Sequence, residues 1–201
     1  MIDGKTLRLR ALAEADLPHL VRFANSRAVT RYLVNFRLPV SVADERAFLR
    51  RMRRSATDRV YSVETRRGRY VGTVGFHDID PVDRACEFGL LIATPRDWGR
   101  GFAAEAIRLG LVVGFERQNL NRLAVPVLAT NQVACAMYAQ LGFTSEGRLR
   151  ERRFMDGRYV DVISFSILAR EYRPKENWRH LGASDDKLRR KPRTIGQPSG
   201  R

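Results

Sequence analysis

The sequence predicts an α/β fold, with a mixed central sheet of about seven strands and helices on both faces. Three observations support this prediction. Strand-like apolar runs alternate with amphipathic helical segments along the chain. A turn containing Gly99 and Gly101 joins one apolar run directly to a helix. Two long strand-like runs flank Asp156-Gly157, a dipeptide typical of a tight hairpin turn.

In the first half of the chain, strands and helices are both expected. The alternation over residues 7–10 predicts an edge strand. Acidic residues and Pro18 favour a helix over about 14–25, and Ser41 can cap the helix that follows it. Three further strands are expected at residues 61–65, 70–76 and 84–92.

The second half begins with the glycine turn. A helix is expected from residue 101 to about 118, then a strand over 122–129 and a short helix from Asn131 that is closed by Gly142. Two closing strands, 144–153 and 159–169, complete the expected sheet.

Length and charge indicate one domain with a basic extension. The 201 residues suit a single compact domain, which we place at 1–172, and 44% of them are hydrophobic. Residues 173–201 hold nine Lys or Arg and three Asp or Glu. We expect this tail to be extended or disordered beyond about residue 180. The net charge of +15 attracts polyanions such as ribosomal RNA, although an arginine-rich solvated surface would give the same number.

The sequence also argues against several classes of protein. It contains no apolar run long enough to span a membrane and does not begin with a signal-peptide pattern, so a cytoplasmic protein without a membrane partner is expected. Cys86 and Cys135 are expected to be free thiols. The histidines show no spacing typical of a metal site, so no metal is expected.

The glycine turn is the strongest functional feature. Glycines spaced in this way let backbone N–H groups face a ligand, and the following helix adds unpaired N–H donors and the positive end of its dipole. Such a turn typically binds phosphate, although a tight turn that binds nothing has the same pattern. The residues expected to form this anion site are Arg96, Gly99, Arg100, Gly101, Phe102 and Ala103.

Two motifs resemble the GNAT superfamily of acyl-CoA-dependent N-acetyltransferases. Arg96, Gly99 and Gly101 match its pyrophosphate-binding signature, and Asn131 precedes Gly142-Phe143 at the spacing of its second signature. The segments Glu146-Gly147-Arg148 and 153–161 are similar to the branch that acetylates the N-terminal alanine of ribosomal proteins. The resemblance covers roughly residues 5–172.

The resemblance implies acetyl-CoA as cosubstrate and a sheet that splays apart between its fourth and fifth strands. Pro126 suits such an opening, because proline cannot donate to a strand ladder, although a bulge or a strand end would also tolerate it. By resemblance, the main chain of Leu91 and Ile92 contacts the pantetheine arm and the thioester. Asn131 is implied as a further cofactor contact, with a helix N-cap as the alternative.

Two residues are expected to perform the chemistry. Tyr138 lies two helical turns after Asn131 and is the expected general acid for the departing thiolate; packing is its alternative role. Glu87 matches an acidic position of the related branch and is the expected base, acting directly or through water. A cross-strand pair with Arg84 is the alternative role of Glu87.

The sequence therefore predicts an N-acetyltransferase that uses a primary amine as acceptor. A protein or peptide α-amine of the ribosomal type is the main expectation, with possible ribosome association and a monomeric or homodimeric state. A polyamine or aminoglycoside is the alternative acceptor, and the basic net charge argues against such polycations. A non-catalytic acyl-CoA-binding protein and an RNA-associated protein are the remaining alternatives.

Overall fold

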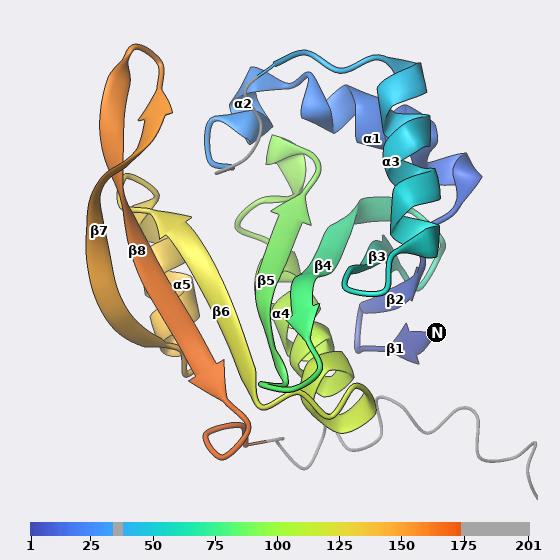
Figure 1. The fold of residues 1–201 in the computed structure, drawn as a ribbon. Coiled ribbons are helices and arrows are strands. Elements are labelled where there is room, and N and C mark those ends of the chain that lie inside the picture. The colour runs from blue at the N-terminus through green and yellow to red at the C-terminus, as the bar shows by residue number, and fades with distance from the viewer. Residues whose placement is uncertain (34–37, 174–201) are drawn as a thin grey trace, which may run out of the picture.

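A computed structural model describes residues 1–33 and 38–173 of the chain. The predicted tail lies outside the described residues, apart from Arg173. One sheet of eight strands, ordered β1-β2-β3-β4-β5-β6-β8-β7, organises the fold (Figure 1). The strands are β1 Ile2–Asp3, β2 Leu7–Ala11, β3 Arg59–Thr65, β4 Tyr70–Asp80, β5 Ala85–Ile92, β6 Arg122–Leu128, β7 Thr144–Met155 and β8 Arg158–Leu168. The helices are α1 Leu17–Ala24, α2 Arg27–Thr30, α3 Val42–Arg54, α4 Phe102–Leu111 and α5 Gln132–Gln140.

The α/β class and the mixed sheet are confirmed, with one correction at the N-terminal edge. The two-residue strand β1 pairs with β2, as Ile2 lies opposite Leu9, and this strand makes eight where about seven were expected. Because β1 lies beside it, β2 is not the edge strand that its alternation predicted, and Leu7 and Leu9 are buried in the core that α4 covers. The pattern of β2 was sufficient to identify a strand but could not reveal a two-residue partner.

The sheet opens between β5 and β6, which are the fourth and fifth of the expected strands. These two parallel strands pair only from Ala85–Arg122 to Glu87–Ala124, and beyond that point they diverge (Figure 1). Every other neighbouring pair of strands is antiparallel. Pro126 lies two residues past the last β5–β6 pair, so the ladder is already open where proline lacks a donor.

Helices cover both faces of the sheet, and each face has its own hydrophobic core. On one face α4 packs closely: a Cβ on Gly110 would lie 2.6 Å from a ring atom of Phe88. The helical segment then continues past Leu111 as a π-helix over Val112–Arg117. On the other face α1 and α3 bury a smaller cluster that includes Phe23 and Leu49.

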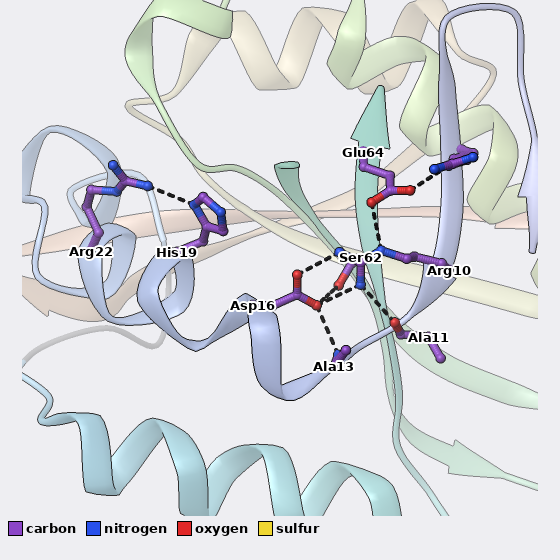
Figure 2. Close-up of polar contacts among 9 residues, drawn as sticks. Arg10, Ala11, Ala13, Asp16, His19, Arg22, Ser62 and Glu64 are labelled. Carbon is purple, nitrogen blue, oxygen red and sulfur yellow. Dashed lines mark hydrogen bonds and ion pairs between the residues drawn. The ribbon is translucent and has the colours of Figure 1, made fainter. Parts of the chain in front are cut away.

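A polar network anchors α1 to the sheet. Figure 2 shows Arg10 between two carboxylates: its guanidinium donates to both oxygens of Asp16 (2.8 and 2.7 Å) and to Glu64 (2.7 Å). Asp16 precedes α1 and also accepts from the Ser62 hydroxyl (2.6 Å) and the Ala13 amide (2.9 Å). Burial favours the neutral acids, but these hydrogen bonds outweigh it and lower the pKa values of Asp16 and Glu64.

Within the described part of the chain, the helices are all too short or too polar to cross a lipid bilayer.

Candidate active site

A groove of about 1270 Å³ lies where the sheet opens. Its floor comes from β4, β5 and β6, and its walls from α1, α3 and α5. Four of the residues predicted from sequence line it: Glu87, Leu91, Asn131 and Tyr138. Leu33 and Leu38 also line the groove, and residues 34–37 between them lie outside the described residues.

The glycine turn has the geometry of an anion site. Gly99 (φ +70°) and Gly101 (φ +80°) adopt the left-handed conformation, which glycine tolerates at no steric cost. A Cβ on either residue would meet nothing within 4 Å, so the space in front of the turn is open. The first backbone bond of α4 runs from the Glu105 amide to the Gly101 carbonyl (3.1 Å). The amides of Phe102 and Ala103 therefore precede the hydrogen-bonded part of the helix and can bind a ligand.

Asp97 holds this turn in place, a role that the sequence analysis missed. Its side chain is 2% exposed and accepts two hydrogen bonds from the Arg69 guanidinium (2.8 and 3.0 Å) and one from Thr94 (2.9 Å). Burial alone would raise the pKa of Asp97, but the bonds from Arg69 and Thr94 lower it. Arg69 belongs to the β3–β4 turn, 28 residues earlier, so no local pattern could have indicated this pairing.

The side chains of Arg96 and Arg100 place positive charge beside the turn. Arg96 is exposed, and the Arg100 guanidinium lies 3.7 Å from Asp97 and 5.3 Å from the centre of the Phe102 ring. A ring beneath the guanidinium limits its orientations without neutralising its charge. The turn therefore combines backbone donors with positive charge, which is the chemistry that a diphosphate requires.

The two predicted residues at the end of β5 differ in their main-chain orientation. The Leu91 carbonyl oxygen lies 1.9 Å from where a Cβ on Gly72 would stand, so this carbonyl faces β4 and not the opening. The Ala93 amide also bonds to β4, at Val71 (2.9 Å). Because main-chain groups alternate along an antiparallel ladder, those of Ile92 face the open side. The Ile92 carbonyl there accepts from the Trp98 indole (3.3 Å), which leaves its amide for a ligand.

Tyr138 is packed in the core and also lines the groove. The residue lines the groove, yet only 4% of its surface is exposed, and its ring packs on Phe143 (5.1 Å) and Phe165 (6.2 Å between ring centres). Burial raises the pKa of Tyr138 above its usual value. The phenol therefore stays protonated and can donate a hydrogen bond, while complete proton transfer becomes harder than for an ordinary tyrosine.

Asn131 and Glu87 stand at opposite sides of the opening. The Asn131 side-chain oxygen accepts from the Ala134 amide (3.2 Å), so this residue caps α5 and still presents itself to the groove. Glu87 is the last β5 residue paired with β6 and lies directly opposite His77 of β4. Its alternative partner, Arg84, instead donates to the carbonyl and side chain of Asn119 (2.7 and 2.8 Å).

These residues fit acetyl-CoA, which supplies the acetyl group when bound. The turn from Arg96 to Ala103 offers donors for the diphosphate, and the open β5 edge at Ile92 offers an amide for the pantetheine arm. Among the described residues, no set of three or more His, Cys, Asp or Glu side chains is arranged to hold a metal ion.

Comparison with known proteins agrees with this geometry. A family model described as an acetyltransferase (GNAT) domain matches residues 6–144. Spermidine N(1)-acetyltransferase of Vibrio cholerae is 33% identical over 167 residues, which cover 83% of this chain and 95% of the relative. The putative ribosomal N-acetyltransferase YdaF of Bacillus subtilis is 31% identical over 105 residues, 52% of this chain and 57% of the relative.

A solved structure extends the comparison to the whole fold. The crystal structure of spermidine N-acetyltransferase from Vibrio cholerae in complex with CoA and spermine gives a TM-score of 0.79 at 30% identity. The match covers 84% of this chain and 99% of that one. The chain therefore belongs to the GNAT acetyltransferase family, as an acetyl-CoA-dependent N-acyltransferase.

Proposed function

We propose that this protein acetylates a primary amine of a small polyamine. The observation that carries this proposal is the charge of the groove. Five carboxylates line it, against two arginines among the described residues. The carboxylates are Asp44, Glu45, Asp58, Asp78 and Glu87, and the arginines are Arg51 and Arg153. A cation with several ammonium groups is the acceptor that this charge pattern attracts.

The net charge of +15 led to the opposite expectation, and the distribution of charge explains the difference. Net charge governs approach at long range, where salt screens it over about 8–10 Å. The charges beside a bound acceptor are those that line the groove, and these are mostly negative. Glu45 is only 6% exposed, and burial, followed by the neighbouring Asp44, raises its pKa. A nearby ammonium group would favour the ionised form of this acid.

The relatives support the same acceptor class. The spermidine N(1)-acetyltransferases of Vibrio cholerae and Escherichia coli each align over more than four fifths of this chain. The putative ribosomal N-acetyltransferase aligns over about half of it. A peptide α-amine, the main expectation from sequence, is therefore the rival acceptor in the experiment.

Within the proposed site, the chain's own residues position the reactants. The glycine turn and Ile92 hold the cosubstrate, Glu87 attracts the ammonium group to the opening, and Tyr138 donates a hydrogen bond to the departing sulfur. Positioning of this kind contributes several kcal/mol to lowering a barrier.

The test measures thiol release from acetyl-CoA with spermidine, spermine, an aminoglycoside and short peptides that begin with alanine or serine. We expect kcat/KM for spermidine to exceed that for the peptides by at least about 100-fold, because each ammonium–carboxylate contact contributes about 1 kcal/mol or more. Glu87→Gln should raise KM for spermidine. Asp83→Asn, an exposed acid on the β4–β5 turn, is the matched control and should not change it. A preference for peptides would refute the proposal.

A further inference from the structure

His77 and Asp58 form a pair of titratable groups in the groove, and the sequence analysis gave neither of them a role. The His77 Nδ1 atom lies 2.9 Å from an Asp58 carboxylate oxygen. Both residues line the groove, with side chains that are 35% and 22% exposed. Burial favours the neutral form of Asp58, but hydrogen bonds from Ser55 and His77 lower its pKa. The acid thus remains charged beside the imidazole.

Two glycines make room for the imidazole ring on the floor of the groove. Gly75 of β4 and Gly89 of β5 lie directly opposite each other in the sheet. A Cβ on Gly75 would stand 2.4 Å from His77 Nε2, and one on Gly89 would stand 4.0 Å from it. The ring therefore lies along the sheet from residue 77 toward Gly75 and Gly89. Any larger residue at position 75 would displace it.

The orientation of the ring places its two nitrogens in different environments. Nδ1 lies within hydrogen-bond distance of Asp58. Nε2 lies over Gly75 and Gly89, in the direction in which β5 continues toward Leu91. Glu87 is the direct cross-strand neighbour of His77, so both side chains emerge on the same face. A carboxylate that orients one nitrogen of an imidazole and stabilises its protonated form is the arrangement that makes the other nitrogen an effective base.

We propose that His77, oriented by Asp58, accepts the proton of the acceptor's ammonium group. This inference rests on the proposed function and divides the role expected for Glu87: the carboxylate attracts the ammonium ion, and the imidazole removes its proton. The N–H bond of the ammonium group breaks, the proton binds Nε2, and the electron pair stays on the amine nitrogen. The freed amine then attacks the acetyl carbon, a C–N bond forms, and the C–S bond of the thioester breaks with its electron pair on sulfur. Of the two protons that the nitrogen loses, one leaves through His77 to solvent and the other ends on the sulfur of the coenzyme.

An ammonium group of a polyamine must lose a proton before its nitrogen can attack the thioester. An alkyl ammonium group with a pKa of about 10.4 is neutral in only about one molecule in a thousand near pH 7.4. A positioned base typically contributes about 10²–10⁴-fold to a rate. Other ionisable side chains that line the groove around the pair are Asp44, Glu45, Arg51, Asp78, Glu87 and Arg153, with Tyr32 and Tyr138. A pH profile of one variant alone would combine their effects.

The experiment therefore compares matched variants of the full-length protein with spermidine and acetyl-CoA from pH 6 to 9.5. His77→Gln should lower kcat by about 10²-fold or more, leave KM within about threefold, and remove the acid limb of the kcat profile. Asp58→Asn should lower kcat by a smaller factor and move that limb to lower pH, because the imidazolium loses its charged partner. His19→Gln, at the other described histidine, should match the wild type. Free imidazole should restore part of the turnover of His77→Ala.

Each outcome bears on the proposal. Calorimetry with acetyl-CoA identifies folded variants, and if His77→Gln fails to fold, Asp58→Asn and the rescue of His77→Ala provide the decision. Overturning results are a His77→Gln enzyme with kcat within threefold of the wild type, an unchanged acid limb in both variants, or a defect confined to KM. If the wild type turns over no amine, the proposed function falls and this inference falls with it. If the wild type is active but the variants behave like it, only the inference fails.

Discussion

Gly99 and Gly101 contribute to the predicted cofactor site through the conformation of their backbone. Their positive φ angles give the turn a conformation that other residues rarely adopt, and the space where their Cβ atoms would lie is open. A left-handed conformation costs other residues about 1–2 kcal/mol. The glycines therefore maintain both the shape of the turn and access to it.

We predict that Gly101→Glu weakens acetyl-CoA binding by at least about 100-fold. The variant places a carboxylate where a diphosphate is expected and strains the backbone, so repulsion and distortion act together. Calorimetry with acetyl-CoA measures the effect. Gly157→Glu is the matched control, because Gly157 also has a positive φ (+78°), has nothing within 4 Å of its Cβ position, and lies in the β7–β8 turn. Wild-type affinity in Gly101→Glu would refute the cofactor site.

Tyr138→Phe should separate chemistry from packing. The ring keeps its contacts with Phe143 and Phe165, and only the hydroxyl is lost, so acetyl-CoA affinity should change less than about threefold. We expect kcat to fall by about 10²-fold, as when one hydrogen-bond donor to developing negative charge is removed. Tyr172→Phe also removes one hydroxyl, which donates to Glu116 (2.7 Å), and should leave kcat unchanged. A Tyr138→Phe enzyme with full kcat would show that the ring acts through packing alone.

At the scale of elements, the sequence predicted most helices and strands because local patterns determine them. Ser41 does cap α3 by accepting from the Asp44 amide (3.2 Å), and the β7–β8 hairpin occurs at Asp156-Gly157, as these turn residues indicated. Two short elements, β1 and α2, carry too few residues for a pattern. They depend on contacts with residues that are distant in sequence.

The sequence predicted site residues only where they lie in a motif or directly beside one. The glycine turn, Glu87 and Tyr138 could be predicted because each lies in or beside a motif of the family, and their roles in the reaction stay predictions. The pairs Arg69–Asp97 and Asp58–His77 were missed because their members belong to different elements, 28 and 19 residues apart. The orientation of Leu91 was likewise set by its register with β4. Neither a side-chain pair across strands nor the direction of a carbonyl follows from composition or spacing.

The network around Arg10 determines how α1 is attached, and it predicts a pH dependence of stability. The pKa values of Asp16 and Glu64 are lower in the folded protein than in the unfolded chain. Their contribution is therefore complete above about pH 5 and is lost as the pH falls through the folded-state pKa values. Denaturant midpoints measured from pH 7 down to pH 2.5 should decrease accordingly.

Neutralising one acid of this network should remove part of that dependence. We expect Asp16→Asn to lower the free energy of unfolding at pH 7 by about 2–3 kcal/mol, since it leaves Arg10 without its bidentate partner. Its stability should then vary less with acid pH than that of the wild type. Glu14→Gln, which breaks an exposed pair with Arg46, should cost under about 1 kcal/mol. Equal effects of the two variants would show that burial of the network adds nothing.

At the scale of the whole molecule, the groove and the glycine turn both precede the basic extension in the chain. Every described residue that lines the groove lies between Leu20 and Arg153, and the glycine turn lies within that range. Tyr172 is the last residue with a described anchoring role, as its ring packs on Phe115 (5.1 Å between ring centres). Residues 173–201 contribute nine basic and three acidic side chains to the overall charge.

We therefore predict that a chain ending at Tyr172 keeps its kcat with spermidine and acetyl-CoA within about twofold of the full-length protein. The reason is that truncation removes charge at long range while the groove keeps all its described residues. Thiol-release kinetics at 50 and 200 mM salt provide the measurement. A second truncation that ends at Leu168 is the control, because it also removes Tyr172 and should lower thermal stability. If RNA binding were the main activity, affinity for RNA would fall steeply with salt and collapse on truncation at Tyr172. Loss of thiol release in the same truncated chain would show that the basic extension belongs to the catalytic unit.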